Sequence, residues 1–254
     1  MIHVVAGAMS IGITLGLLGS GGSIVTVPVL AYLVGQEQKV AIAGSLVIVG
    51  LISFIASLPL IKRKQVDWHS VLYFGVPGMI GTYLGAWAAG FVNGDVQFIA
   101  FAGVMVIAAY KMLQPKQQSE SDGDTKRSIT KIGLDGILVG SVTGFVGVGG
   151  GFLIVPALVI LGGLTMQRAV ATSLVIIAMK SLSGFIKYQQ VLDANQLHLD
   201  WSVIALVTII GIVGSQVGTQ LNQRIPQQAL KTGFGIFLVL MAGYISWQTV
   251  PALI

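Results

Sequence analysis

The chain has 254 residues, of which 54% are hydrophobic and only 9% are charged. A soluble domain carries roughly 25% charged residues, so this composition excludes a water-soluble globule and predicts an all-α integral membrane protein. The net charge of +5 does not indicate a nucleic-acid partner, because the basic residues lie between apolar runs rather than along one helical face.

Eight apolar segments follow one another, most of them close to the ~20 residues that a helix needs to cross a membrane. The N-terminal stretch has no Lys or Arg before its apolar residues, and its apolar character continues past residue 30. We therefore interpret it as a retained membrane segment rather than a signal peptide. The predicted segments cover residues 3–34, 40–61, 69–92, 96–114, 130–162, 168–190, 200–222 and 228–249.

The first and fifth segments are each too long for one crossing and too short for two. Both are interrupted by a glycine cluster, at Gly19–Ser23 and Gly147–Gly151, and then by a proline, Pro28 or Pro156. Glycine and proline weaken or end a helix, and broken backbone in a membrane must be buried in protein or line a wet cavity. We expect both segments to fold as helical hairpins or sharply bent helices with tips inside the protein.

The sequence also indicates an internal duplication. GLLGSGGSIVTVPVL at 16–30 aligns with GFVGVGGGFLIVPAL at 144–158, and AIAGSLVIVG at 41–50 aligns at the same offset with AVATSLVIIA at 169–178. Duplicated halves of four segments each are typical of transporters. The predicted organisation is a first transmembrane repeat at 1–113, a polar linker at 114–128 and a second transmembrane repeat at 129–254.

Basic residues at the segment ends bear on the orientation of the halves. If the first and fifth segments return to their own side, each half makes three crossings and the two halves are inverted. With Lys180 left out because it lies well within a segment, all other Lys and Arg residues then share one side, except Lys39 and Lys187. Positive residues gather on the cytoplasmic side, so the inverted arrangement is favoured over parallel halves.

The glycine clusters do not match a nucleotide-binding motif, because no strand precedes them and no P-loop lysine follows. Close helix packing through small residues is expected at the glycine pairs Gly12/Gly16, Gly81/Gly85 and Gly214/Gly218. The clusters themselves have two interpretations. They either allow close helix packing, or each precedes a half-helix whose free N–H groups attract an oxyanion. The substrate-binding hypothesis comprises Gly19, Ser20, Gly21, Gly22 and Ser23 in one cluster and Gly147, Gly149, Gly150 and Gly151 in the other.

Lys180 is the most informative single residue, because it lies well inside the sixth segment, where a charge is costly and usually functional. It either neutralises the substrate in a cavity or reaches to the nearer interface. Its counterpart in the first half is Ile52. Ser45 and Ser173 occupy matched positions, with Thr172 beside the second, and their hydroxyl groups bond either to the oxyanion or to backbone.

No metal, cofactor or catalytic site is expected. The three histidines lie near segment ends without a partner at metal-ligand spacing, and the chain has no cysteine. A membrane-embedded enzyme needs titratable groups near the midplane, where only Lys180 is found. The protein is therefore not expected to be an enzyme.

The paired motifs GSGGSIVTVP and GVGGGFLIVP, each followed by A-x-A-[GT]-S-L, resemble the sulfite exporter TauE/SafE family. The resemblance covers essentially the whole chain and departs at Ser23, where a third glycine is typical. It implies a multi-pass protein of the cytoplasmic (inner) membrane that exports sulfite or organosulfonates. It also implies a site at the two glycine clusters with Ser45, Thr172 and Ser173, to which the energetic argument adds Lys180.

We predict a secondary transporter that exports a small sulfur-containing oxyanion by alternating access between the halves. No ATP-binding motif is present, and anion exit from a negative interior is favoured by ~2.3 kcal/mol per charge per 100 mV. The alternatives are a passive anion channel and a non-transport membrane assembly protein. The expected partners are the anion and membrane lipid, while the oligomeric state stays open, with a homodimer as one option.

Overall fold

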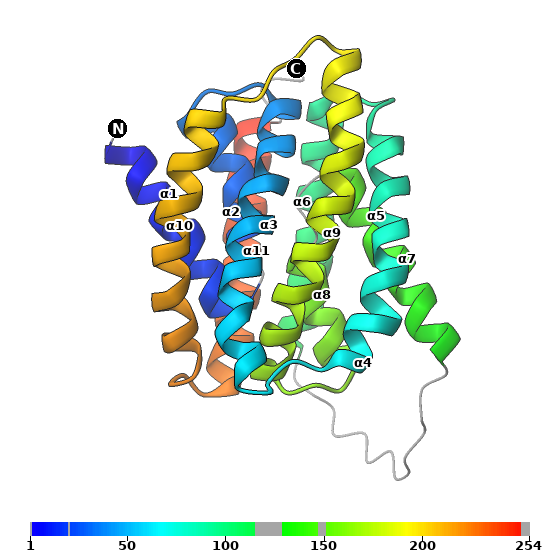
Figure 1. Ribbon diagram of the computed structural model, residues 1–254, viewed down its shortest axis with the longest axis vertical. Coiled ribbons are helices and arrows are strands. Elements are labelled where there is room, and N and C mark those ends of the chain that lie inside the picture. The colour runs from blue at the N-terminus through cyan, green and yellow to red at the C-terminus, as the bar shows by residue number, and fades with distance from the viewer. Residues whose placement is uncertain (1, 20, 115–128, 147–150, 250–254) are drawn as a thin grey trace.

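In the computed structural model, the described residues are 2–19, 21–114, 129–146 and 151–249, and the regular elements within them are helices. Figure 1 shows these helices packed side by side as a bundle. Short π-helical stretches are labelled η. The elements are α1 (Ile2–Leu18), α2 (Gly21–Pro28), η1 (Val29–Leu33), α3 (Gln38–Lys62), α4 (Trp68–Ser70), η2 (Val71–Gly75), α5 (Val76–Ala89), α6 (Gly94–Leu113), α7 (Ile129–Val146), α8 (Gly151–Pro156), η3 (Ala157–Leu161), α9 (Met166–Ala194), α10 (Trp201–Asn222) and α11 (Gln227–Thr249).

Within the described residues, five helices are long and apolar enough to cross a membrane, namely α3, α6, α9, α10 and α11. The helix from His3 to Leu18 and the one from Ile24 to Leu33 are shorter but also apolar. Large hydrophobic side chains cover the outside of the bundle, among them Phe91, Leu138 and Trp247, each more than 60% exposed. Water would make such a surface aggregate, whereas lipid solvates it. The all-helical membrane class predicted from composition is confirmed.

The first apolar segment is a helical hairpin. A Cβ atom on Gly7, early in α1, would lie 3.0 Å from Val29 at the start of η1. A Cβ on Gly22, early in α2, would instead overlap the carbonyl oxygen of Ile11 in the second half of α1. Early residues of one helix therefore face late residues of the other, so the two run antiparallel. In the fifth segment α7 ends at Val146 and α8 begins at Gly151.

Two of the most extensive helix contacts are made through glycine. Helix α1 lies along α10, where a Cβ on Gly12 would overlap the carbonyl oxygen of Gly211. Helix α5 lies along α7, where a Cβ on Gly85 would overlap the carbonyl oxygen of Ser141. The backbones touch directly, as small residues permit in membrane helices. Close packing is confirmed at the predicted pairs Gly12/Gly16, Gly81/Gly85 and Gly214/Gly218.

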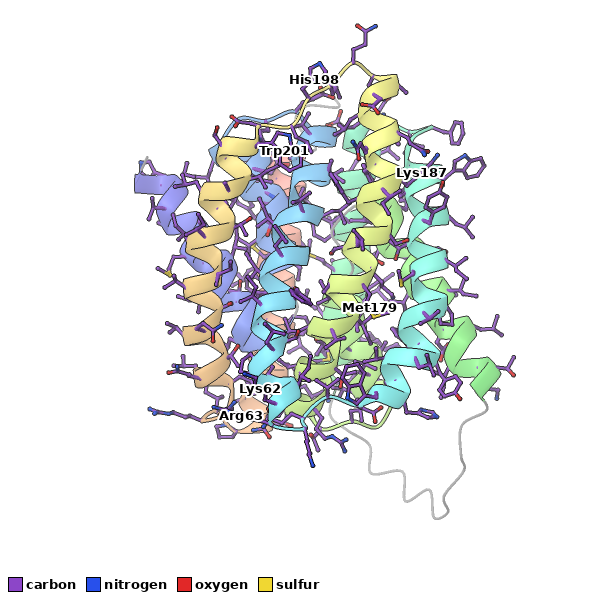
Figure 2. The ribbon with its side chains drawn as sticks, in the orientation of Figure 1. Lys62, Arg63, Met179, Lys187, His198 and Trp201 are labelled. Atoms are coloured by element: carbon purple, nitrogen blue, oxygen red, sulfur yellow. The ribbon has the colours of Figure 1, made fainter. Side chains whose placement is uncertain are left out.

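Helices α3 and α9 cross the middle of the molecule in opposite directions, as their colours show in Figure 1. Gly50 faces Ser181, whereas Leu46, four residues before Gly50, faces Gly184, three residues after Ser181. In Figure 2 Lys62 and Arg63 mark one end of the bundle, while His198 and Trp201 mark the other, with Met179 between the two levels. The facing pairs along α3 and α9 give the relative depth, along the bundle axis, of residues on the two helices.

Basic residues concentrate at the end of the bundle where α3 finishes. The Arg63 guanidinium donates a hydrogen bond to Gln223 Oε1, 2.5 Å away, just beyond α10. Arg168, near the start of α9, lies 4.0 Å from the Asp67 carboxylate in the loop that follows α3. Lys187, in contrast, lies toward the opposite end (Figure 2). The two ends of the molecule therefore differ in charge.

Candidate functional site

The first hairpin reverses at Gly19, whose φ of +69° is readily adopted only by glycine. Its N–H donates to the carbonyl oxygen of Leu15 at 2.8 Å, and its own carbonyl oxygen accepts a hydrogen bond from Ser173 Oγ at 3.0 Å. A Cβ on Gly19 would lie only 2.8 Å from Cα of Val170. Conformation and space both require glycine here, and the hairpin tip is fixed against α9.

Helix α2 starts directly after this tip. It begins at Gly21, so the N–H groups of Gly21, Gly22 and Ser23 have no acceptor within their own helix. The carbonyl oxygen of Gly22 accepts a hydrogen bond of 2.6 Å from the buried hydroxyl of Thr26. Ser20 lies outside the described residues. The first turn of α2 therefore carries amide donors that the helix itself does not satisfy, close to α9.

The second glycine cluster is described only at its end. Gly151 is the first residue of α8, while Gly147, Gly149 and Gly150 lie outside the described residues. Helix α8 contacts α9 and approaches α2. The hydrogen bonds described next fix the helix that leads into this cluster.

Buried polar side chains hold the last turns of α1 and α7. Asn222 Nδ2 on α10 donates to the carbonyl oxygen of Leu17 in α1 at 2.6 Å. Gln97 Nε2 on α6 and the Tyr188 hydroxyl on α9 both donate to the carbonyl oxygen of Phe145 in α7, at 3.0 and 3.3 Å. Leu17 and Phe145 are aligned by the 128-residue offset. These three polar residues were not singled out from the sequence, although each is a polar side chain within an apolar segment.

The predicted hydroxyl groups are engaged with backbone in this conformation. Ser45 Oγ donates to the carbonyl oxygen of Ile42 at 2.7 Å. Thr172 Oγ1 accepts a hydrogen bond from the backbone N–H of Asp67 at 2.9 Å, and so holds the loop after α3. Ser173 holds the tip at Gly19. In this conformation the three side chains therefore stabilise the fold through hydrogen bonds with backbone.

Ser45 and Ser173 lie at different depths. Because α3 and α9 are antiparallel and Leu46 faces Gly184, Ser45 lies near one end of the crossing and Ser173 near the other. At 1.5 Å per residue, about twelve residues separate the two levels, or roughly 18 Å. The structure brings Ser173 together with Gly19, but it does not bring either of them together with Ser45.

Lys180 lies at the midpoint of α9, one residue after the Met179 labelled in Figure 2. Among the described residues it is the one charged side chain that is buried, with 0% of its surface exposed. Its Nζ lies 4.8 Å from the centroid of the Phe74 ring and has no hydrogen-bond partner within the described residues. A Cβ on Gly78 would overlap its Cε and Nζ atoms. The ammonium group is thus enclosed by η2 and α5 and does not reach an interface.

Lys180 and Ser173 share one face of α9. They are seven residues apart, which is close to two helical turns and about 10 Å along the axis. Long side chains on a helix point back toward its N-terminus, and this direction leads from Lys180 toward Ser173. The side chain ends against Gly78 and Phe74, so the ammonium lies at a depth between the levels of Ser173 and Ser45.

Two further polar groups at the α3–α9 crossing lack partners. The hydroxyl groups of Ser53 and Ser181 are buried and make no hydrogen bond within the described residues. These serines are also related by the 128-residue offset. Buried polar atoms are normally paired, so Ser53, Ser181 and Lys180 leave unused hydrogen-bonding capacity at the centre of the molecule.

A groove of about 470 Å³ also lies between α3 and α9. Its lining is apolar apart from Ser181 and includes Leu51, Phe54 and Leu182, which are large side chains exposed on the outside of the bundle. Such a lining suits a lipid chain rather than an anion. Within the described part of the chain, no three His, Asp or Glu residues come close enough to hold a metal ion.

Apolar spans, a helical hairpin folded back inside the bundle and a buried unpaired cation are features of a multi-pass membrane transporter. The chain belongs to the Sulfite exporter TauE/SafE family, whose model matches residues 4–245. The protein is accordingly a membrane transporter that crosses the cytoplasmic (inner) membrane several times.

Similar proteins extend over the same length. A "Probable membrane transporter protein" of Xylella fastidiosa (strain 9a5c) is 30% identical over 250 residues, which cover 96% of this chain and 94% of that protein. The "Probable membrane transporter protein YunE" of Bacillus subtilis is 28% identical over 267 residues, with 95% of each chain covered. The "Probable membrane transporter protein MJ0441" of Methanocaldococcus jannaschii is 26% identical over 248 residues, with 91% of each covered. No solved structure matches the chain significantly.

Proposed function

We propose that the protein is a secondary transporter that exports a small sulfur-containing oxyanion, such as sulfite or an organosulfonate, by alternating access. The observation that carries the proposal is the buried Lys180 ammonium, which has no hydrogen-bond partner in the part of the chain that the structure describes. An unpaired charge in a membrane protein interior is costly, and such residues usually serve a transported ion or ligand. An arriving oxyanion supplies the missing counter-charge. It is released unchanged, so no chemical conversion is involved.

The proposed path uses two half-sites on either side of Lys180. On one side lie the first cluster, from Gly19 to Ser23, and the neighbouring Thr172 and Ser173. On the other side we place Gly151, at the start of α8, and Ser45, and the sequence alone assigns Gly147, Gly149 and Gly150 to this half-site. The depth difference between Ser45 and Ser173 favours sequential rather than simultaneous contact with one small anion, with helix-start amides as donors.

The two half-sites follow from a proposed duplication into inverted repeats at 1–113 and 129–254, joined by the linker at 114–128. Contacts related by the sequence offsets support it: Gly12 meets Gly211 between α1 and α10, and Gly140 meets Gly78 between α7 and α5. The opposite directions of the matched helices α3 and α9 in Figure 1 favour inversion. In inverted repeats, one half opens to each side in turn.

The basic end of the bundle gives the proposed orientation. Lys62, Arg63 and Arg168 share the end that also receives the start of α7 after the linker. By the positive-inside rule this end faces the cytoplasm. Exit of an anion from there is assisted by the membrane potential.

Counterflow in proteoliposomes tests the proposal. Vesicles loaded with unlabelled sulfite are expected to accumulate external labelled sulfite transiently and saturably. Lys180→Ala is expected to reduce the rate at least ~tenfold, whereas Lys187→Ala, on the same helix but paired with Gln190 near the interface, retains most of it. Non-saturating flux without counterflow would indicate a channel. Absence of uptake for sulfite, sulfonates and thiosulfate alike would contradict transport of a sulfur oxyanion.

A further inference from the structure

We infer that the anion carried past Lys180 bears a single negative charge. The inference rests on the proposed function and goes further by naming the charge of the substrate. For sulfite it means that the hydrogensulfite ion, rather than the doubly charged ion, is transported. For organosulfonates it means that the rest of the molecule carries no second net charge.

The first step is a count of charges at the centre of the bundle. Lys180 is the one buried charged side chain among the described residues. The elements around it contribute the Phe74 ring, the backbone of Gly78 and, nearby, the carbonyl oxygen of Gly136 on α7. Ser20 and the stretch 147–150 carry no ionisable side chain, as the printed sequence shows. One positive charge is therefore available to a bound anion.

Titratable residues also occur on the neighbouring elements. On α7 they are Lys131 and Asp135, near the start of the helix, and on α4 His69, all at least partly exposed. Within the described residues, none of them donates to or accepts from the Lys180 ammonium. They do not add a second full charge to the enclosed site.

The second step is the energy of matching charges. A monovalent oxyanion beside Lys180 forms a neutral pair, and Ser53 and Ser181 have hydroxyl groups free to donate to its oxygens if the α3–α9 crossing opens. A divalent anion leaves one negative charge unpaired in an interior of low polarity, which is strongly unfavourable. Discrimination then depends on net charge more than on size.

The third step is the asymmetry between the halves. Ile52 is aligned with Lys180, and it packs on Gly211 as Lys180 packs on Gly78. The first half therefore places an apolar residue where the second half places its cation. Two cations at these matched positions would suit a divalent anion, but this chain has one. The difference also provides a gain-of-charge variant, Ile52→Lys.

The test measures competition in proteoliposomes that carry out counterflow of labelled methanesulfonate. Ethanesulfonate and 1,2-ethanedisulfonate are the competitors, because they share a carbon skeleton and differ in charge. For the wild-type chain, the concentration of the disulfonate that gives half-inhibition is expected to be at least ~tenfold higher than that of ethanesulfonate, which is equivalent to about 1.4 kcal/mol. In Ile52→Lys the ratio is expected to fall, and Lys180→Met is expected to lose counterflow.

The outcomes separate this inference from the proposed function. Equal competition by the two sulfonates in the wild-type chain, with counterflow intact, overturns the single-charge inference and leaves sulfur-oxyanion transport standing. Normal counterflow in Lys180→Met also overturns the inference, because the counter-charge is then not needed. Failure of the wild-type chain to transport methanesulfonate, sulfite or thiosulfate overturns both.

Discussion

Lys180 and Gly78 illustrate how one residue on each of two helices defines the centre of the molecule. The lysine side chain occupies the volume that a Cβ on Gly78 would fill, and the Phe74 ring covers its ammonium group. A cation–π contact of this kind stabilises a desolvated ammonium by about 2 kcal/mol, which offsets only part of the cost of burial. The remaining deficit is what an anion is proposed to relieve.

Gly78→Ala tests this arrangement directly. The added methyl group overlaps Cε and Nζ of Lys180, so we expect a loss of about 1–3 kcal/mol in the free energy of unfolding. In a Lys180→Ala background the methyl group still meets the carbonyl oxygen of Gly136 at 3.2 Å but no longer overlaps the lysine, so the loss is expected to be smaller. Thermal unfolding of the four proteins in detergent gives the coupling, and Gly103→Ala, with open space around it, is the control. Equal effects of Gly78→Ala in both backgrounds would contradict the geometry.

At the scale of helices, the last turns of α1 and α7 depend on polar groups that lie far away in the sequence. Asn222 belongs to the second half of the chain but donates a hydrogen bond to the carbonyl oxygen of Leu17 at the end of α1. Gln97 belongs to the first half but donates a hydrogen bond to the carbonyl oxygen of Phe145 at the end of α7. The ends of α1 and α7 each receive a hydrogen bond from the other half of the chain, since a carbonyl group at a helix end inside a membrane protein needs a donor.

Asn222→Leu is expected to leave the carbonyl oxygen of Leu17 unsatisfied at nearly constant side-chain volume. The cost of such a buried acceptor is about 1–3 kcal/mol, which lowers the midpoint of thermal unfolding by several degrees. Gln220→Leu, on the exposed side of the same helix, is the matched control and should leave the midpoint unchanged. A midpoint for Asn222→Leu equal to that of the control would argue against the hydrogen bond.

The membrane class and the range of α3 were predictable because both follow from local composition. Hydropathy located α3 within two residues at its start and one at its end, and the glycine cluster correctly marked the end of α1. Helix partners were not predictable, because in lipid the pairing of α1 with α10 depends on matching backbone surfaces rather than on hydrophobicity. The depths of Ser45 and Ser173 were hidden for a similar reason: aligned positions in two antiparallel helices need not share a level.

At the scale of the whole molecule, the bundle has one end rich in basic residues and another nearly free of them. Figure 2 places Lys62 and Arg63 at the first end and His198 at the second. Because the chain contains no cysteine, single cysteines report the side of the membrane without background. We expect His198→Cys to react with an impermeant maleimide in intact cells, and Lys62→Cys to react only after the membrane is permeabilised. The opposite pattern would reverse the proposed orientation.

The most direct measurement for the whole account is counterflow of labelled methanesulfonate, which does not react with disulfides, by Lys180→Cys before and after reaction with 2-aminoethyl methanethiosulfonate. This reagent replaces the lost ammonium group at the same position in an otherwise cysteine-free chain. We predict that counterflow by the cysteine variant is at least ~tenfold slower than by the wild-type chain. Attachment of the positively charged aminoethylthio group is expected to restore a large part of the rate, whereas a neutral alkylthiosulfonate is not. Full counterflow by the unmodified cysteine variant would contradict the role of Lys180 as the counter-charge of the transported anion.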